Sequence, residues 1–132
     1  MAKYVYPAIF QKEGDLYSIT FPDLPNCISS GEGMQDAIEN AEDALCLVLY
    51  HMEKDGKKIP NVSDPFAIKI PQNAFVSLVN CDTIEYEKFY NNKAVKKTLT
   101  IPQWLNEKAM QNNINFSQTL QNALMEQLNI NQ

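Results

Sequence analysis

Glu39 and Asp43 are the side chains whose spacing best suits acid–base chemistry. Four residues apart on a helix, they would share one face. General acid–base catalysis by such a pair requires at least one carboxyl group in a sheltered site that shifts its pKa. Asp36 and Glu42 belong to the same stretch, and a run of acids of this kind is typical of a solvated helix face. We therefore interpret Glu39 and Asp43 as exposed surface residues and not as a catalytic pair.

Nucleophilic catalysis and metal binding have little support in the sequence. The serines lack the G-x-S-x-G context of a nucleophile elbow, and His51 is the only histidine, which excludes a multi-histidine metal site within one chain. Residues 31–33, Gly-Glu-Gly, are too short for a phosphate-binding loop. The cysteines are far apart, and we interpret all three as buried or half-buried thiols: Cys27, Cys46 and Cys81. No catalytic residue, metal ligand or cofactor is predicted.

Charge is distributed unevenly along the chain. The 132 residues include 11 lysines, no arginine and 16 acids, for a net charge of −5. This argues against a chain coated along its whole length by nucleic acid or anionic membrane. Residues 1–92 carry 7 lysines and 14 acids, net −7, whereas residues 93–132 carry 4 lysines and 2 glutamates, net +2. A local field governs electrostatic partners, so the positive C-terminal segment is a candidate for contact with a polyanion.

The composition is typical of a globular protein. Hydrophobic residues make up 45% of the chain, which excludes wholesale disorder. No stretch approaches about 18 uninterrupted apolar residues, so neither a transmembrane helix nor a membrane partner is predicted. The first ten residues lack the apolar core and cleavage site of a signal peptide. Together with the odd number of unpaired cysteines, this predicts a cytoplasmic protein.

Residues 1–82 are predicted to form one α+β domain with the order β-β-β-α-β. The strands are expected at residues 4–10, 16–21, 26–30 and 75–81. Residues 21–25 contain two prolines and are expected to be a loop, and Pro7 indicates that the first strand lies at an edge or carries a bulge. A helix is expected from residue 34, with apolar positions at helical spacing and Gly56 just beyond its end.

A polar linker is predicted at residues 83–92, followed by a second domain at residues 93–132. Its first element is an alternating strand over residues 94–101. Pro102 ends this strand and fits the first position of a helix over residues 103–111. Asn115, with Gln118 three residues later, is expected to open a second helix as a capping box.

This second domain cannot bury a core alone, because it consists of one unpartnered strand and two short helices. A dimer would supply both the missing strand partner and the missing core. The strands of two copies would pair antiparallel across a two-fold axis, and the four helices would share one core. The apolar side chains expected in this dimer core are Val95, Leu99, Ile101, Leu105, Leu120 and Leu124.

A two-stranded ribbon of this kind fits the major groove of DNA. Its exposed face would carry Lys96, Thr98 and Thr100 from each copy, whose donors and acceptors suit base edges. Backbone amides near Phe116 and Ser117 would hold a phosphate at the N-terminus of the second helix. The alternative interpretation is that these lysine and threonine side chains are only the solvated face of a strand.

Two motifs resemble a known family. Residues 93–106, read K-A-V-K-K-T-L-T-I-P-Q-W-L-N and followed by the helix that Asn115 opens, resemble a ribbon-helix-helix DNA-binding domain of the version that ends some HicB antitoxins. Residues 21–27, F-P-D-L-P-N-C, then Ser30-Gly31 and the pattern A-x-x-N-A-x-x-A-L at residues 37–45, resemble the HicB body. The motifs occur in the family's order and cover nearly the whole chain.

The resemblance implies an antitoxin that is not an enzyme. Its N-terminal domain would have a reduced RNase H-like fold that lacks the nuclease's carboxylate set. This domain would bind a HicA toxin, a small mRNA-cleaving protein, and cover the toxin's active site. The segment Phe21, Asp23, Leu24 and Pro25, with the adjoining strands, is the expected contact. The C-terminal domain, as a homodimer or within a tetramer, would bind operator DNA and repress the antitoxin's own operon.

The resemblance also implies which residues meet DNA. By their position in the motif, the base-reading residues would be Lys96, Thr98 and Thr100, while Lys97, on the core side of the strand, would snorkel to a phosphate. The full set expected to contact DNA is Lys93, Lys96, Lys97, Thr98, Thr100, Asn115, Phe116 and Ser117. The chain departs from many such readers because it has no arginine, which grips guanine through two hydrogen bonds.

Two alternative functions remain open at this point. The first is a transcriptional repressor whose N-terminal domain senses a small ligand. The second is a residual Mg²⁺-dependent ribonuclease that uses Asp15, Asp23 or Glu39, which would require oxygen ligands converging on one point.

Overall fold

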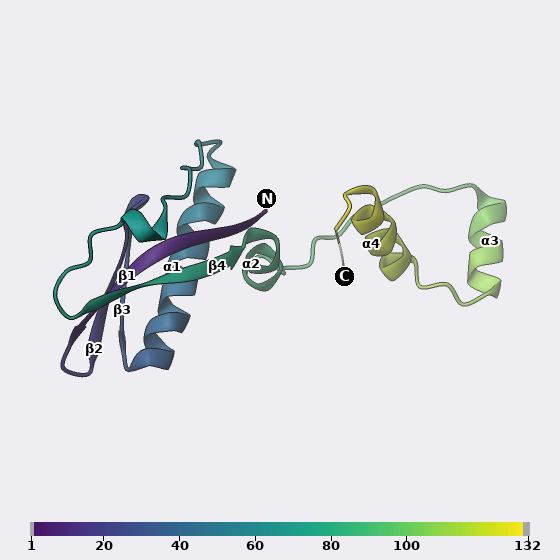
Figure 1. Ribbon diagram of the computed structural model, residues 1–132. Helices are drawn as coiled ribbons and strands as arrows, with labels where there is room; N and C mark the ends of the chain where they lie inside the picture. The colour runs from purple at the N-terminus through teal and green to yellow at the C-terminus, as the bar shows by residue number, and fades with distance from the viewer. Residues whose placement is uncertain (1, 131–132) are drawn as a thin grey trace. The chain divides into compact units, whose positions relative to one another are not determined.

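A computed structural model of the chain describes residues 2–130 and separates them into two units. Unit 1 is Met1–Lys93 and unit 2 is Ala94–Gln132, so the division falls between Lys93 and Ala94. Unit 1 contains a four-stranded sheet and the helices α1 and α2, and unit 2 contains the helices α3 and α4 (Figure 1). No helix within residues 2–130 is both long and apolar enough to cross a membrane.

The sheet of unit 1 has the order β3-β2-β1-β4, with every neighbouring pair antiparallel. Its strands are β1 (Lys3–Glu13), β2 (Leu16–Phe21), β3 (Leu24–Glu32) and β4 (Ala74–Asp82). The four predicted strands are thus confirmed, and so is the mixed α+β class. In β2 the predicted alternation holds, because Tyr17, Ile19 and Phe21 are buried while Leu16, Ser18 and Thr20 are exposed.

Two proline predictions need correction. The loop expected at residues 21–25 shrinks to a turn at Pro22 and Asp23, because β3 already begins at Leu24 and includes Pro25. Because β3 is an edge strand, its outer side has no neighbouring strand to bond, and the N–H that Pro25 lacks costs no hydrogen bond there. Pro7 lies in β1, a central strand, but the pairing of β1 with β2 begins only at Ile9. Pro7 therefore has a neighbouring strand on one side only.

Helix α1 (Met34–Lys54) covers one face of the sheet (Figure 1). The predicted apolar stripe is buried at Ala37, Ala41, Leu45 and Leu49, which join the strands' inward residues in one core. At the start of the stripe, Met34 and Ile38 are instead exposed, along with Leu47 on another face. Gly56 follows the end of α1 as predicted, and its φ angle is 68°. A helix often ends at a residue in the left-handed conformation, which glycine adopts at low cost.

The predicted linker at residues 83–92 is wrong, because residues Thr83–Tyr90 form helix α2. The Asp82 carboxylate caps this helix by accepting hydrogen bonds from the backbone N–H groups of Ile84 (3.0 Å) and Glu85 (3.3 Å). The Tyr86 ring then packs against Tyr50 of α1 with ring centroids 5.4 Å apart. These contacts make α2 part of unit 1.

In unit 2, helices α3 (Gln103–Gln111) and α4 (Phe116–Gln127) lie where the sequence predicted them. Pro102 is the N-cap of α3, one position earlier than expected. Asn115 caps α4 as predicted, because its Oδ1 accepts the Gln118 N–H at 3.0 Å; the Gln118 amide, however, donates to Asn122 and not back to Asn115. Residues 94–101 have no regular secondary structure in the single chain. Their pairing with a second copy stays a prediction.

Candidate functional site

The lysine-rich segment before α3 is accessible throughout. Lys93, Lys96, Lys97, Thr98 and Thr100 are all exposed. Three ammonium groups and two hydroxyls within eight residues form a positively charged stretch rich in hydrogen-bond donors, which is the chemistry that phosphates and base edges require.

The first turn of α4 presents the second predicted contact. Asn115 uses its side chain to cap the helix, so this residue holds the helix end rather than a ligand. Phe116 is 45% exposed and Ser117 is exposed, with the Ser117 Oγ accepting a hydrogen bond from Gln121 Nε2 at 3.3 Å. The N–H groups at this helix end carry the positive end of the helix dipole, which favours an anion.

The predicted dimer core is uncovered in the single chain. Val95 is 78% exposed and Leu99 63%, while Ile101, Leu105 and Leu124 are exposed and Leu120 is intermediate. Among the described residues of unit 2, residues 94–130, none is buried. A segment that buries none of its residues has no core of its own, and burial of its apolar side chains against a partner stays a prediction.

The predicted toxin-contact segment in unit 1 is used mainly inside the fold. Phe21 and Leu24 are only 2% and 4% exposed, so their side chains are not available to a partner. Asp23 accepts hydrogen bonds from the Ser63 backbone N–H (3.0 Å) and from the Ser63 hydroxyl, which ties the loop after α1 to the β2–β3 turn. Pro25 alone of the four is exposed. The expectation that these side chains form a contact surface is therefore wrong for Phe21 and Leu24.

The carboxylates proposed for a residual nuclease do not converge. Asp15 lies in the β1–β2 turn and Asp23 in the β2–β3 turn, at opposite ends of β2, and Glu39 is on the exposed side of α1. Within residues 2–130, no group of three or more His, Cys, Asp or Glu residues is placed to hold a metal ion. The geometry gives the ribonuclease alternative no site.

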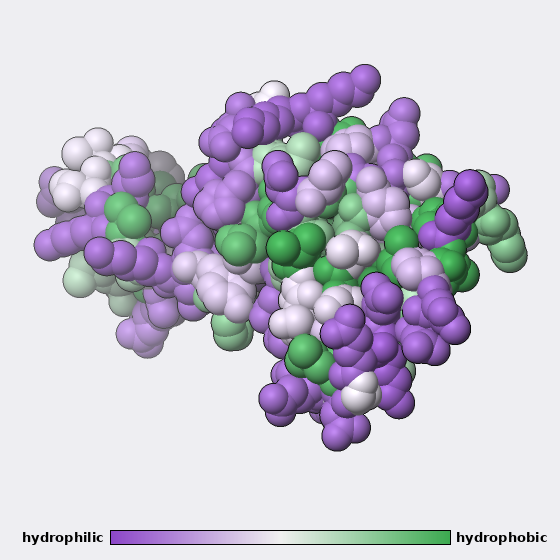
Figure 2. Space-filling view, turned by 90° about the vertical axis from the view of Figure 1, so that its left-hand side faces the viewer, coloured by the Kyte–Doolittle hydropathy of each residue, from purple (hydrophilic) through white to green (hydrophobic). Residues whose placement is uncertain are grey.

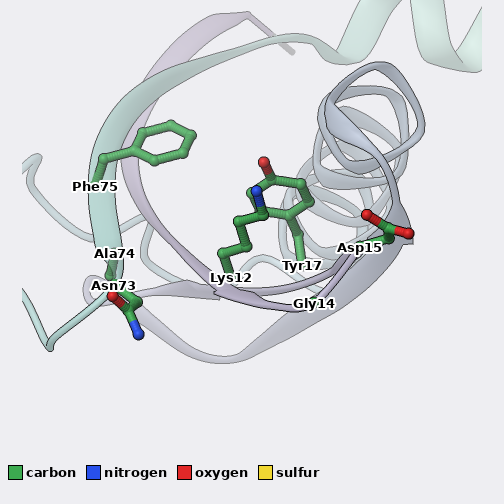
Figure 3. Close-up of a pocket in the computed structure, with 7 residues that line it drawn as sticks. All are labelled: Lys12, Gly14, Asp15, Tyr17, Asn73, Ala74 and Phe75. Carbon is green, nitrogen blue, oxygen red and sulfur yellow. The ribbon is translucent and has the colours of Figure 1, made fainter.

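A hollow of about 640 Å³ opens at the end of the sheet, between the β1–β2 hairpin and the start of β4 (Figure 3). Its lining residues are Lys12, Gly14, Asp15, Tyr17, Asn73, Ala74 and Phe75. Figure 3 shows Phe75 and Asp15 on opposite sides of Tyr17. The hollow is where the ligand-sensing alternative would place a small molecule.

Several ionisable groups with perturbed pKa values lie where α1 meets the sheet. Burial and a 2.8 Å hydrogen bond to Glu53 raise the pKa of Tyr4 to about 12. Burial acts to raise the pKa of Glu53, but hydrogen bonding to Thr83 and Tyr4 outweighs it and holds that pKa below its ordinary value. Hydrogen bonding to Cys81 lowers the pKa of the Cys46 thiol, and the same contact raises that of Cys81.

The predicted state of the cysteines is confirmed. Cys27 and Cys81 are buried, Cys46 is half-buried, and all three are free thiols. Burial raises the pKa of Cys27 to about 11, which keeps it an unreactive thiol in the core.

Comparison with known proteins identifies the family. A family model described as the HicB-like antitoxin of bacterial toxin–antitoxin systems matches residues 6–128. The chain belongs to this HicB-like antitoxin family. The predicted family is therefore confirmed, and with it the prediction that the protein is an antitoxin rather than an enzyme. The match spans both units.

Individual relatives of the chain support the same family assignment. The chain is similar to a chain in a solved toxin–antitoxin complex from Streptococcus pneumoniae, with a TM-score of 0.62 and 26% identity, covering 95% of this chain and 99% of that one. A chain from a solved HicA3 and HicB3 toxin–antitoxin complex matches with a TM-score of 0.51 and 25% identity, over 60% of this chain and 99% of that one. Antitoxin HicB 2 of Photorhabdus laumondii is 23% identical, over 90% of this chain and 87% of its own length.

Sequence reasoning missed one part of this HicB-like chain that bears on binding. Helix α2 carries Tyr86 and Tyr90 at i,i+4 spacing, and their rings are 4.5 Å apart between centroids. The signal was present in the sequence, since Asp82-x-x-Glu85 is a helix-start pattern followed by aromatic residues at helical spacing. The polar character of the stretch favoured a linker instead.

Proposed function

We propose that this HicB-like protein neutralises a HicA-like toxin through unit 1. Membership of the antitoxin family carries this proposal, and the solved relatives that contain a toxin or HicA3 together with an antitoxin support it. Unit 1 supplies a surface of net negative charge, which suits a basic, RNA-handling partner. Binding would cover the toxin's active site, and the β-β-β-α-β order supports a reduced RNase H-like scaffold for that role.

Apolar side chains on unit 1 support a protein contact as well. Figure 2 shows green, apolar side chains gathered on the face of this unit that is turned toward the viewer, with hydrophilic ones around them. Among the exposed apolar residues of the unit are Ile28 at 69%, Leu78 at 55% and Phe66 at 98%. Exposed apolar groups bordered by polar ones are typical of protein-interaction surfaces.

Unit 2 is proposed to be a ribbon-helix-helix module that dimerises and binds operator DNA. Residues 94–101 of two copies would pair as an antiparallel ribbon, and Val95, Leu99, Ile101 and the apolar faces of α3 and α4 would be buried together. The observation that supports this is that none of the described residues of unit 2 is buried in one chain. Lys96, Thr98 and Thr100 would then face the major groove, in a cytoplasmic autorepressor that acts as a dimer or a tetramer.

Co-purification tests the antitoxin proposal. The chain is expressed together with the small basic protein encoded beside it, and the two are expected to elute as one complex that lacks RNA cleavage. A wild-type chain that fails to retain that protein would contradict the proposal.

A band-shift on the DNA upstream of the operon tests the DNA-binding proposal. Replacing Lys96 and Thr98 together by alanine is expected to abolish specific binding and to leave toxin binding intact. Lys108→Ala, which removes a lysine of α3 outside the proposed ribbon, is the matched control. Affinity of the wild type should fall steeply as salt increases, because phosphate contacts release counterions; a flat salt response would rule out the positive ribbon as the contact.

A further inference from the structure

A groove in unit 1 runs between α1, α2 and β3. It has a volume of about 360 Å³ and is open to solvent. The residues that line it are Ser29, Asn40, Asp43, Ala44, Leu47, Tyr86 and Tyr90.

The floor of the groove is held rigidly by hydrogen bonds. Ser29 Oγ donates to the Asn40 carbonyl at 3.2 Å, and the Asn40 side-chain amide donates to the Ser30 carbonyl at 2.8 Å. These bonds fasten α1 to the edge strand β3 through two residues that line the groove. A groove that is formed in advance costs little ordering when a partner binds.

Tyr86 and Tyr90 line one wall, and they continue a series of tilted ring contacts that begins at Tyr50 behind the groove. The Tyr50 and Tyr86 centroids are 5.4 Å apart, and those of Tyr86 and Tyr90 are 4.5 Å apart. At the far end of this series the Lys54 ammonium already sits 4.8 Å from the Tyr50 centroid, in a cation–π contact. At the groove end, Tyr90 is 59% exposed, so its ring is open to a cation from outside.

The groove carries negative charge. Asp43 is the charged residue of its lining and is exposed. Burial, the neighbouring Tyr90 phenol and the Asp43 carboxylate raise the pKa of the Tyr86 phenol. Glu39 and Glu42 are exposed on the same helix, and α1 has no lysine before Lys54. A cation that enters this groove would meet a carboxylate and aromatic faces at the same time.

We propose that this groove receives a lysine or arginine side chain of a basic protein partner. The inference rests on the proposed function, since the partner in question is the HicA-like toxin. The cationic head group would lie between the Asp43 carboxylate and the Tyr90 ring, and its aliphatic stem would lie along Leu47, which is 46% exposed. Unit 1 of a second copy is a poor occupant, because residues 1–93 carry 8 lysines against 14 acids and like charges would repel. A nucleic acid is disfavoured by the same sign of charge.

The test measures the Kd of the full-length chain for the HicA-like toxin, in a catalytically inactive form of the toxin, by titration calorimetry. Asp43→Asn and Tyr90→Leu are each expected to raise the Kd about 3- to 30-fold, the range of a lost cation–π or partly desolvated charge contact. Tyr90→Phe retains the ring and is expected to bind like the wild type. Glu42→Gln, which removes a neighbouring carboxylate outside the groove, is the matched control and should change the Kd less than about twofold.

The other outcomes would contradict the proposal that this groove receives a cationic side chain of the toxin. If the wild type binds the toxin and the Asp43 and Tyr90 variants bind equally well, the groove is not the contact, while the proposed antitoxin function stands. Equal weakening of toxin binding by Glu42→Gln and Asp43→Asn would indicate that the toxin responds to the overall negative charge of this surface and not to the groove. Failure of the wild type to bind would overturn the proposed function itself. Because both substituted side chains are exposed, circular dichroism of each variant is expected to match the wild type and so separates lost contact from lost fold.

Discussion

Gly31 shows how a single residue sets the distance between a helix and a strand. It is buried in β3, and a Cβ atom placed on it would lie 2.5 Å from the backbone nitrogen and Cα of Ala37 in α1. Backbone atoms cannot move aside as a flexible side chain can. The close approach of α1 to β3, and therefore the floor of the groove, depends on the missing side chain.

Gly31→Ala is expected to destabilise the protein by more than about 3 kcal/mol, because the clash is with backbone and exceeds ordinary overpacking. Gly14→Ala is the matched control. Gly14 has a φ angle of 63° but nothing within 4 Å of an added Cβ, so only the left-handed strain of about 1 kcal/mol is expected. Urea unfolding followed by circular dichroism measures both, and equal effects of the two substitutions would contradict the packing argument.

Asp23 belongs to the segment that resembles the HicB family, but its side chain is hydrogen-bonded within this chain. Its carboxylate accepts two hydrogen bonds from Ser63, forty positions away, and fixes the course of the long loop after α1. The neighbouring Phe21 and Leu24 are core residues. The motif at residues 21–27 therefore has a role in folding, and a toxin contact through its more exposed residues stays a prediction.

At the scale of elements, Glu53 links the end of α1 to the sheet. It accepts a hydrogen bond from the Tyr4 hydroxyl of β1, and its pKa is below the ordinary 4.5. A lowered native pKa contributes stability that is present above pH 4.5 and lost as the pH falls through the native value. The raised pKa of Tyr4, about 12 against 10, contributes stability that is lost above pH 10.

We therefore expect the urea midpoint of unit 1 to fall at both extremes, below about pH 4.5 and above about pH 10. Glu53→Gln should lower the midpoint at neutral pH and flatten the acid limb, since the ionised partner of Tyr4 is gone. Glu42→Gln, an exposed position on the same helix, is the control and should retain the wild-type profile. An acid limb unchanged by Glu53→Gln would show that other carboxyl groups cause the loss.

At the scale of the whole molecule, the two units differ in how they obtain a core. Unit 1 buries its own, centred on α1 and the sheet, whereas the described part of unit 2 buries none of its residues. If unit 2 obtains its core by the proposed dimerisation, the stability of the C-terminal end is expected to depend on protein concentration.

Leu124→Glu is expected to convert the protein to a monomer in sedimentation experiments, because it places a charge in the proposed shared core of α4. Operator binding should be lost with the dimer, while toxin binding through unit 1 is retained. Val62→Glu alters an equally exposed apolar residue in the loop of unit 1, 53% against 50%, and should leave the association state unchanged. An associated Leu124→Glu variant would contradict the proposed core.

The sequence by itself determined the local features of this protein. The alternation of β2, the extents of α3 and α4, the cap at Asn115 and the stop at Gly56 each depend on residues within a few positions of one another. Two motifs also determined the family, which the match over residues 6–128 confirmed. These features could be predicted because short-range sterics and hydrogen bonding control them.

The tertiary structure decided what depends on distant residues. It showed that Pro25 lies in an edge strand, that Asp23 pairs with Ser63, and that Tyr86 of α2 packs against Tyr50 of α1. It also separated Asp15 and Asp23 to opposite ends of β2 and brought Asp43, Leu47 and Tyr90 together in one groove. Such placements arise from contacts between segments far apart in the chain, and no local pattern encodes them.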